Sequence, residues 1–390
     1  MKSTLAALAA MTICLPIAQA QTGAKPFDMY FVDTEGGLSA LYVSPSGETM
    51  LLDTGNPGDR DLDRILDVLK DAGVKQIDYM VITHYHIDHV GSYQALYEKI
   101  PMKHFVDHGV DRDTREHIKG FYAWYTAMTA KAGPGARMIA KPGDIIPIKG
   151  LKVEVLTADG KVLKKPIAGA PGAGKPNPAC ASYKKQPPNT DLDNAASLAL
   201  VFQYGKFRTI NMGDFVYDEE GDLMCPNNPI GTIDLYLTAH HSTDQSGSAA
   251  LVHALRPRVT VMTNGQRKGG AAPVYQVLHT SPGMEDIWQL HYSLPGGLEN
   301  NAPGLFIANV EDPKALGSYL ENPPAPRVPG AARGPRGASG RGGRGRGFSG
   351  PIAPHNSGPA YYIKVSAMPD GSFTVTNTRN NFSKTYAAKK

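Results

Sequence analysis

The residues most able to do chemistry lie in one short string, Val-Ile-Thr-His-Tyr-His-Ile-Asp-His-Val-Gly, at positions 81–91. It holds three imidazoles and one carboxylate, those of His84, His86, Asp88 and His89. Imidazole and carboxylate are the usual ligands of Zn²⁺ and similar divalent cations. An apolar run precedes the string and a helical pattern follows it, so a turn at a strand end would bring these side chains together. A solvated histidine-rich loop does not account for that context. The string therefore predicts a metal site.

The surrounding pattern indicates which elements position this string. Residues 77–82 form an apolar run typical of a buried strand, and residues 92–99 have the pattern of a helix. Apolar residues at i, i+3, i+4 and i+7 predict an earlier helix over about 61–72, ended by Gly73. A helix bearing packed aromatic residues is predicted over 112–131. Further strands are predicted at 27–32, 40–43, 50–52, 102–106, 151–156, 197–202, 207–212 and 259–262.

The string and three other segments resemble the metallo-β-lactamase superfamily of metal-dependent hydrolases. Residues 50–55, Met-Leu-Leu-Asp-Thr-Gly, resemble its apolar strand that ends in Asp-x-Gly. Residues 211–214, Asn-Met-Gly-Asp, resemble its strand-terminal Gly-Asp. Residues 234–242, Asp-Leu-Tyr-Leu-Thr-Ala-His-His-Ser, resemble the His-His-Gly-Ser segment of one branch. That branch includes the nuclease-like domain of bacterial competence (DNA-uptake) proteins and choline-phosphate esterases of cell-wall polymers.

The resemblance implies an α/β fold, an αββα sandwich of two mixed sheets with helices outside and ligands at strand ends. It also implies a two-cation arrangement in which Asp214 bridges the cations. We assign the metal ligands as His84, His86, Asp88, His89, Asp214 and His240, and the catalytic residues as Asp88 and His241. Adjacent residues at a strand end point in opposite directions, so one of His240 and His241 should bind metal while the other faces the substrate, and the reverse assignment of the two stays open. One or two Zn²⁺ ions are the expected cofactor, with Mn²⁺ as the alternative. For Asp214 the competing interpretation is a helix N-cap after a glycine turn.

Two departures from the family pattern concern the metal ligands. Ser242 stands where the branch usually has glycine, which bears on the backbone shape of that loop. Many members also supply a third histidine to the first cation, but here the corresponding strand is followed by Ala158-Asp159-Gly160. Asp159, Asn194 and His108 are candidate replacements. The first site could also be completed by water or filled by Mn²⁺, or the centre could be mononuclear. We expect Asp53 to order the metal loop by hydrogen bonding.

The N-terminus predicts export from the cytoplasm. Residues 1–20 have the pattern of a signal peptide, with Lys2, an apolar stretch and a small-x-small end. We expect residues 21–390 to form a single metallo-hydrolase domain that is secreted or periplasmic, with no transmembrane segment after cleavage. Cys180 and Cys225 are then expected to pair in an oxidising compartment, two buried free thiols being the alternative.

The last part of the chain has a low-complexity segment followed by a hairpin pattern. Residues 322–360 are rich in Pro, Gly and Arg and are expected to be a disordered insertion. Its Arg-Gly repeats could bind an anionic polymer, the alternative being a solvated loop. Residues 361–377 predict a C-terminal hairpin that docks on a sheet edge. The formal net charge is only +4, so overall charge gives no argument for nucleic-acid binding.

These features together predict a secreted metal-dependent hydrolase, in which a metal-bound hydroxide attacks a phosphoryl or carbonyl centre. Phosphodiesters of nucleic acid or a cell-wall polymer are the favoured substrates. The alternatives are carboxylic ester, lactone or β-lactam hydrolysis at the same site, and a non-catalytic metal-binding surface protein that captures anionic polymer. The basic, glycine-rich residues 264–270 could grip a phosphate or be an ordinary turn. No phosphate-cradling P-loop or dinucleotide fingerprint appears.

Overall fold

A computed structural model describes residues 23–113, 118–186, 191–310 and 360–389. The predicted signal peptide at 1–20 and nearly all of the Arg-Gly segment lie outside the described residues. Among the described residues, no helix is both long and apolar enough to cross a bilayer.

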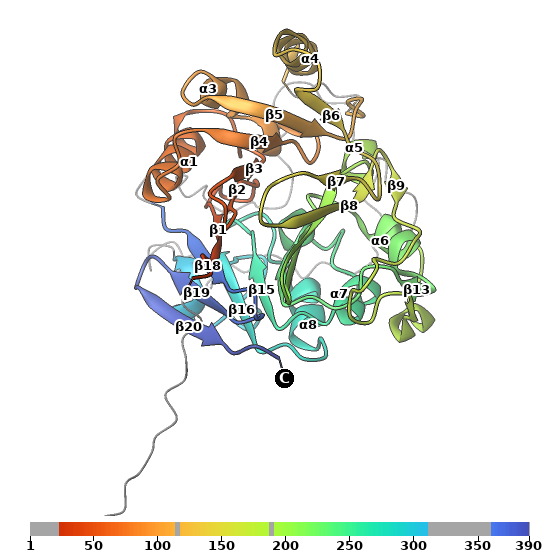
Figure 1. The fold of residues 1–390 in the computed structure, drawn as a ribbon. Coiled ribbons are helices and arrows are strands. Elements are labelled where there is room, and N and C mark those ends of the chain that lie inside the picture. Colours follow the sequence, from red (N-terminus) through yellow and green to blue (C-terminus); the bar gives the residue numbers. More distant parts are fainter. Residues whose placement is uncertain (1–22, 114–117, 187–190, 311–359, 390) are drawn as a thin grey trace, which may run out of the picture.

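Two mixed sheets form the centre of the described structure (Figure 1). The first has the order β20-β19-β18-β1-β2-β3-β4-β5-β6, with β3 to β6 parallel and the remaining pairs antiparallel. Its strands are β1 Phe27–Phe31, β2 Ala40–Val43, β3 Thr49–Leu52, β4 Ile77–Val81, β5 Met102–Asp107, β6 Arg137–Ile139, β18 Ile363–Ala367, β19 Phe373–Asn377 and β20 Phe382–Tyr386.

The second sheet has the order β17-β16-β15-β14-β12-β11-β8-β7, with β9 paired to β8. Strands β12, β14, β15, β16 and β17 run parallel, and the other pairs are antiparallel. The strands are β7 Ile145–Ile146, β8 Lys152–Ala158, β9 Lys161–Val162, β11 Ala199–Tyr204, β12 Phe207–Asn211, β14 Leu235–Leu237, β15 Val259–Met262, β16 Asp286–His291 and β17 Ile307–Asn309. A small separate ribbon pairs β10 Lys175–Pro176 with β13 Asn227–Asn228.

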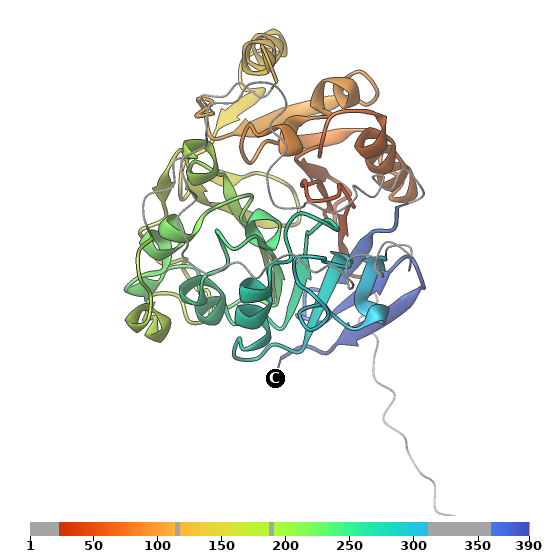
Figure 2. The ribbon, with the colours of Figure 1, turned by 180° about the vertical axis from the view of Figure 1, so that it is seen from behind.

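Helices lie on the outer faces of both sheets, as the front and back views show (Figures 1 and 2). The α-helices are α1 Asp59–Asp71, α2 Ile87–Val90, α3 Tyr93–Tyr97, α4 Phe121–Lys131, α5 Leu192–Ala195, α6 Tyr217–Met224, α7 Ala249–Leu255 and α8 Ala272–His279. The 3₁₀ turns are η1 Pro178–Ala181, η2 Ala239–Ser242 and η3 Gly304–Phe306. The predicted αββα sandwich is therefore confirmed.

The strands read as nearly unbroken apolar runs because both of their faces are covered. In β2, Tyr42 points into the core between the sheets, whereas Leu41 joins the cluster beneath α1, α3 and α4. In β11, Phe202 and Val201 alternate in the same way, Val201 facing α6, α7 and α8. The rings of Tyr42 and Phe202 stack with their centroids 4.3 Å apart, which ties the two sheets together.

Most predicted elements are present within about two residues of their expected bounds, and two helices differ more. The helix expected over 112–131 begins only at Phe121, after Gly120 with a φ of 73°. Glycine tolerates this left-handed conformation, so the chain can turn there into the helix. The helix expected over 92–99 is preceded by α2, so Asp88 and His89 lie on a helical turn. The aromatic residues of α4 are packing residues: the Phe121 and Tyr125 rings are buried.

The C-terminal hairpin is present as β18 and β19, with β20 added beside it. Strand β18 pairs antiparallel with β1, so a segment from the end of the chain extends the first sheet next to its first strand. Figure 1 shows these blue strands continuing the sheet from the red β1. The predicted pairing of Cys180 with Cys225 is also confirmed; the bridge joins η1 to the residue that ends α6.

Candidate metal centre

The residues of the centre follow the carboxyl ends of parallel strands in both sheets. The string that holds His84 to His89 follows β4, Asp214 follows β12, and His240 and His241 follow β14. The carboxyl ends of parallel strands lie at one edge of a sheet, where the following loops converge. In a two-sheet sandwich the two edges face each other, which explains how β4 and β12, from different sheets, supply one cluster.

Four side chains from these loops bring their ligand atoms within 4.8 Å of one another: those of Asp88, His89, Asp214 and His241. The Nε2 atom of His241 lies 3.3 Å from Asp88 Oδ2 and 3.2 Å from Asp214 Oδ2. His89 Nε2 lies 3.2 Å from Asp214 Oδ1 and 3.3 Å from His241 Nε2. Ligands that share one cation at about 2.0–2.2 Å are separated by similar distances. This donor set therefore fits a divalent cation.

Asp53, the first residue after β3, holds His89 in this orientation. Its carboxylate accepts hydrogen bonds from the backbone and hydroxyl of Thr83 and lies 2.7 Å from His89 Nδ1. A carboxylate can only accept, so the imidazole donates from Nδ1 and keeps its Nε2 lone pair for the cluster. The geometry agrees with the ordering role expected for Asp53.

The two histidines after β14 lie in a tight left-handed turn. The φ angles of His240, His241 and Ser242 are 50°, 53° and 63°. Side chains therefore do not alternate as in a strand, and both imidazoles approach Asp214; His240 Nε2 lies 3.5 Å from Oδ2. Ser242 adopts the conformation in which the branch has glycine, and its hydroxyl donates to Thr238 Oγ1 at 2.7 Å. The serine is thus accommodated without loss of the turn.

Gly213 and Gly269 allow the loops to approach this closely. Gly213 has a φ of 55°, and a Cβ atom there would lie 2.8 Å from the Cβ of Thr83, beside the histidine string. A Cβ on Gly269 would lie 1.9 Å from the carbonyl oxygen of His241. Both positions require glycine for its positive φ and for the space.

A second part of the centre is formed by His84 and His86. Their rings lie edge to face with centroids 4.5 Å apart, and His84 Nε2 is 4.0 Å from Asp214 Oδ2. His84 is fully buried, and its Nε2 has no hydrogen-bond partner among the described residues. His86 Nε2 faces two carboxylates, lying 3.1 Å from Asp191 Oδ1 and 3.7 Å from Asp113 Oδ2. Buried polar atoms normally have a partner, so the unpaired Nε2 of His84 fits a metal ligand.

Burial and mutual interaction set the protonation of these groups. Burial, with the neighbouring His89 and His86, lowers the pKa of His84 well below its usual value, so the ring is neutral. Burial also lowers the pKa of His240 to about 4. For Asp214, burial is outweighed by His241, His89 and His240, and its pKa falls well below the usual range. For His86 and His89, burial is outweighed by nearby carboxylates, Asp191 for His86 and Asp214 for His89, and the pKa of each ring is raised. A cation bound here would take the place of a proton on these two rings.

Lys268, from the loop after β15, forms an ion pair with Asp88. The ion pair places the ammonium group of Lys268 directly at the cluster. Burial would raise the pKa of Asp88, but Lys268 and His89 outweigh it and hold that pKa well below its usual value. The glycine-rich turn is therefore part of the mouth of the centre.

Comparison with known proteins agrees with this geometry. Residues 33–175, which include the histidine string, match the model of the metallo-beta-lactamase superfamily. That match runs from the loop after β1 to Lys175, the first residue of β10. The matched residues include Asp88 and His89 of the candidate cluster, whereas Asp214 and His241 lie beyond the match.

Solved structures of the same fold are similar to this chain. The metallo-beta-lactamase fold protein YhfI from Bacillus subtilis is 12% identical, with a TM-score of 0.42, over 68% of this chain and 96% of that chain. The metallo-beta-lactamase GOB-18 from Elizabethkingia meningoseptica is 15% identical, with a TM-score of 0.31, over 53% and 68%. BJP-1, a subclass B3 metallo-beta-lactamase of Bradyrhizobium japonicum, is 16% identical, with a TM-score of 0.30, over 48% and 61%. No curated protein matches the chain significantly.

Among the candidate replacements for the third histidine, Asp159 and His108 belong to neither group of close ligand atoms in the described structure, and Asn194 is buried with an Oδ1 that lacks a hydrogen-bond partner among the described residues. Asp159 instead accepts a hydrogen bond from Arg112 Nε at 2.9 Å and from Lys161 at 3.2 Å. The buried His108 lies 3.7 Å from Asp193. The sequence interpretation missed Asp113 and Asp191, whose Asp-rich surroundings, Asp111-Arg-Asp113 and Asp191-Leu-Asp193, were the available signal.

A second cluster that the sequence interpretation missed consists of Asp33, Glu35 and His291. His291 Nε2 lies 2.9 Å from Asp33 Oδ2 and 3.3 Å from Glu35 Oε1. Arg64 pairs with the same Asp33 oxygen at 2.9 Å. The Arg64 guanidinium already balances the charge of these carboxylates. The ion pairs therefore link the loop after β1 to α1 and β16.

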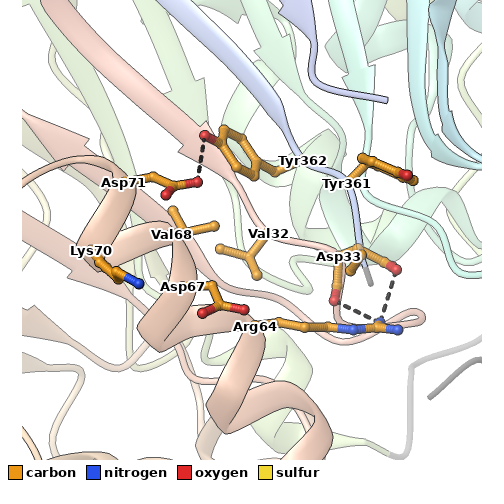
Figure 3. A pocket seen from close by; sticks show the side chains of 10 residues that line it. Val32, Asp33, Arg64, Asp67, Val68, Lys70, Asp71, Tyr361 and Tyr362 are labelled. Carbon is orange, nitrogen blue, oxygen red and sulfur yellow. Dashed lines mark hydrogen bonds and ion pairs between the residues drawn. The ribbon is translucent and has the colours of Figure 1, made fainter. Parts of the chain in front are cut away.

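A cavity of about 280 Å³ lies beside that second cluster and not at the histidine string (Figure 3). Figure 3 shows the paired Asp33 and Arg64 on one side and Tyr362, bonded to Asp71, on the other. It is lined by Val32, Asp33, Arg64, Asp67, Val68, Lys70, Asp71, Ala360, Tyr361 and Tyr362. Both charge signs line the cavity, and none of the lining residues belongs to the centre formed by Asp88, His89, Asp214 and His241.

Proposed function

We propose that this chain is a hydrolase that uses one or two divalent cations, and that phosphodiesters are its substrates. The observation that carries the proposal is the convergence of Asp88, His89, Asp214 and His241 from two sheets on one point. The open Nε2 of His84 supports a second cation position on the other side of Asp214. Zn²⁺ is the expected ion, with Mn²⁺ as the alternative.

Within this proposal, Asp88, His89, Asp214 and His241 hold one cation, and His84, His86 and Asp214 hold the other. This exchanges the assignments of His240 and His241 made from the sequence. The geometry supports the exchange because His241 Nε2 lies within 3.3 Å of both Asp88 and His89, whereas His240 approaches Asp214 alone. A divalent cation bound here would acidify a water molecule toward neutral pH and stabilise a developing oxyanion.

His240 is the residue best placed to exchange a proton with the substrate. The Ser246 hydroxyl donates to the Phe215 carbonyl at 2.7 Å, so its oxygen accepts from His240 Nδ1 at 3.2 Å. That bond leaves the lone pair on His240 Nε2, at the edge of the cluster. His240 therefore holds the tautomer needed to accept a proton or to face an oxygen-bearing substrate.

The positive charge of Lys268 favours an anionic substrate. Once Asp88 binds a cation, Lys268 is free to contact a phosphodiester or carboxylate oxygen at the mouth of the centre. This supports phosphodiesters, in line with the resemblance to the competence-protein-like branch. Esters, lactones or β-lactams with a carboxylate remain the second candidate, since the same charge would bind them.

The disulfide supports a location in an oxidising compartment. Bridges such as Cys180–Cys225 persist in secreted and periplasmic proteins and are rare in the cytosol. Together with the predicted signal peptide at 1–20, this is the basis for proposing export.

Polymer capture by the Arg-Gly segment remains a prediction, tested by deleting residues 326–350 and measuring retention on an anionic polymer.

The test combines metal analysis with a substrate panel of bis(p-nitrophenyl) phosphate, nitrocefin and lactones. Wild type is compared with Asp88→Ala and Asp214→Ala, and with Asp159→Ala as a matched control, a carboxylate outside the cluster. We expect hydrolysis of the phosphodiester to fall at least about 100-fold in the two cluster variants, more than for loss of a supporting partner. The control should keep wild-type turnover.

Each outcome of this experiment separates one alternative. Unchanged turnover in both cluster variants rejects the mechanism. Cleavage of lactones or nitrocefin but not of the phosphodiester selects the carbonyl substrates. Stoichiometric cation without turnover of any substrate, combined with polymer retention, supports the non-catalytic binding protein instead.

A further inference from the structure

The surroundings of His86 differ from those of the other histidines in the string. Whereas His89 faces Asp214 and His241, His86 faces the carboxylates of Asp191 and Asp113. These carboxylates come from loops that follow β5 and precede α5, so neither belongs to the family segments described above. Both carboxylates therefore lie beside the pair of histidines for which the sequence supplies no third imidazole.

We propose that Asp113 and Asp191 complete the binding site of the cation held by His84 and His86, in place of the missing imidazole. This inference rests on the proposed function for the cation itself and adds two ligands to it. The distances of 3.1 Å and 3.7 Å from His86 Nε2 are those expected between two ligands of one ion. The open, fully buried Nε2 of His84 is the independent observation that points to an ion there.

Supporting contacts hold these carboxylates beside the string. Asp193 is fully buried and accepts hydrogen bonds from the backbone N–H of Tyr85 at 2.6 Å and of Arg112 at 2.9 Å. It therefore ties the loop of His84 and His86 to the loop of Asp113. Asp191 caps α5, accepting from the backbone N–H of Asn194 at 3.4 Å, which fixes the start of that turn. Such supporting partners orient metal ligands.

The proposed donor set is rich in oxygen, which has a consequence for metal choice. His84 and His86 supply two nitrogens, and Asp113, Asp191 and Asp214 supply carboxylate oxygens. Carboxylate ligands suit harder cations such as Mn²⁺, whereas a third imidazole would favour Zn²⁺. The preference for Zn²⁺ over Mn²⁺ should thus be smaller at this position than at the Asp88–His89–Asp214–His241 position.

Mn²⁺ binding to the full chain, stripped of metal beforehand, tests the inference without any activity assay. The electron paramagnetic resonance signal of free Mn²⁺ gives stoichiometry and affinity. We expect two equivalents for wild type, and one position weakened by at least about 10–100-fold in Asp191→Asn and in Asp113→Asn. Asparagine can still cap α5, and Asp159→Asn, a carboxylate bound to Arg112 and Lys161, is the matched control that should keep both equivalents.

A gain-of-function variant covers the case in which Asp113→Asn fails to fold. Asp191→His installs an imidazole, and it should shift competition between equal Mn²⁺ and Zn²⁺ toward Zn²⁺ at this position. One equivalent in wild type, or two unchanged equivalents in folded Asp191→Asn, would overturn the inference. Wild type that binds two ions through these residues but hydrolyses nothing would instead reject the proposed function and leave the inference standing.

Discussion

Asp53 offers the sharpest test of how the fold prepares the metal centre. Substitution to asparagine keeps the volume but replaces one acceptor oxygen by an NH₂ donor. The backbone N–H of Thr83 is fixed 2.8 Å from Oδ1 and keeps the remaining oxygen facing it. The new amide then faces His89 Nδ1, which is 2.7 Å from Oδ2 in the wild type.

The imidazole can respond by changing its tautomer. With the amide donating to Nδ1, the proton of His89 moves to Nε2, and that nitrogen can no longer bind a cation. Loss of such a supporting partner costs about 10–100-fold in metal affinity, or roughly 1.4–2.7 kcal/mol. Folding stability should change less, because the Thr83 hydroxyl can rotate to accept from the new amide.

The assay is competition for Zn²⁺ between the protein and a chromophoric chelator, with urea unfolding measured in parallel. Asp107→Asn is the matched control: Asp107 is equally buried, but it pairs with Arg137 and Tyr125 and contacts no metal-site histidine. We expect weaker Zn²⁺ binding for Asp53→Asn only. A folded Asp53→Asn protein with wild-type affinity would refute the argument that Asp53 fixes the tautomer of His89.

Three further changes test other parts of the structure. Replacing Cys180 and Cys225 by serine should lower the free energy of unfolding in urea by ~2–4 kcal/mol without changing cation stoichiometry; unchanged stability contradicts this. Burial lowers the pKa of His291, but Asp33 outweighs burial and raises that pKa from 6.5 to about 10. The charged imidazole therefore stabilises the fold fully below pH 6.5, and this contribution is lost as the pH rises toward 10. His291→Gln should thus cost about 3–5 kcal/mol at low pH and progressively less as pH rises, as chemical denaturation across that range would measure. Lys268→Met should raise KM for bis(p-nitrophenyl) phosphate by about 10-fold or more, as expected for a lost charge-assisted contact, but not KM for a neutral ester; equal effects on both substrates argue against anion binding.

Much of the centre could be predicted from local sequence. The spacing of His84, His86, Asp88 and His89 is meaningful by itself, since the string must turn between a strand and a helix. Strand positions were also predictable from local sequence. The strands that contain Leu51 and Val201 are apolar on both faces because each sheet is covered on both sides. The hairpin around Pro369-Asp370-Gly371 depended only on turn chemistry.

Other features depended on contacts between distant segments. Both His240 and His241 approach Asp214 because three successive residues adopt left-handed φ, which the alternation rule for strands does not foresee. Nor does any local pattern connect His86 with Asp191, more than 100 residues away in a different loop, at 3.1 Å.

The sequence by itself determined which residue types are available to bind a cation and on which strand ends they stand. Only the tertiary structure decided which of these side chains meet: His241 with His89, Asp53 behind His89, and the carboxylates of Asp113 and Asp191 beside His86. The physical reason is that local backbone preferences act over a few residues, whereas the packing of two sheets across one core sets which loop ends face each other.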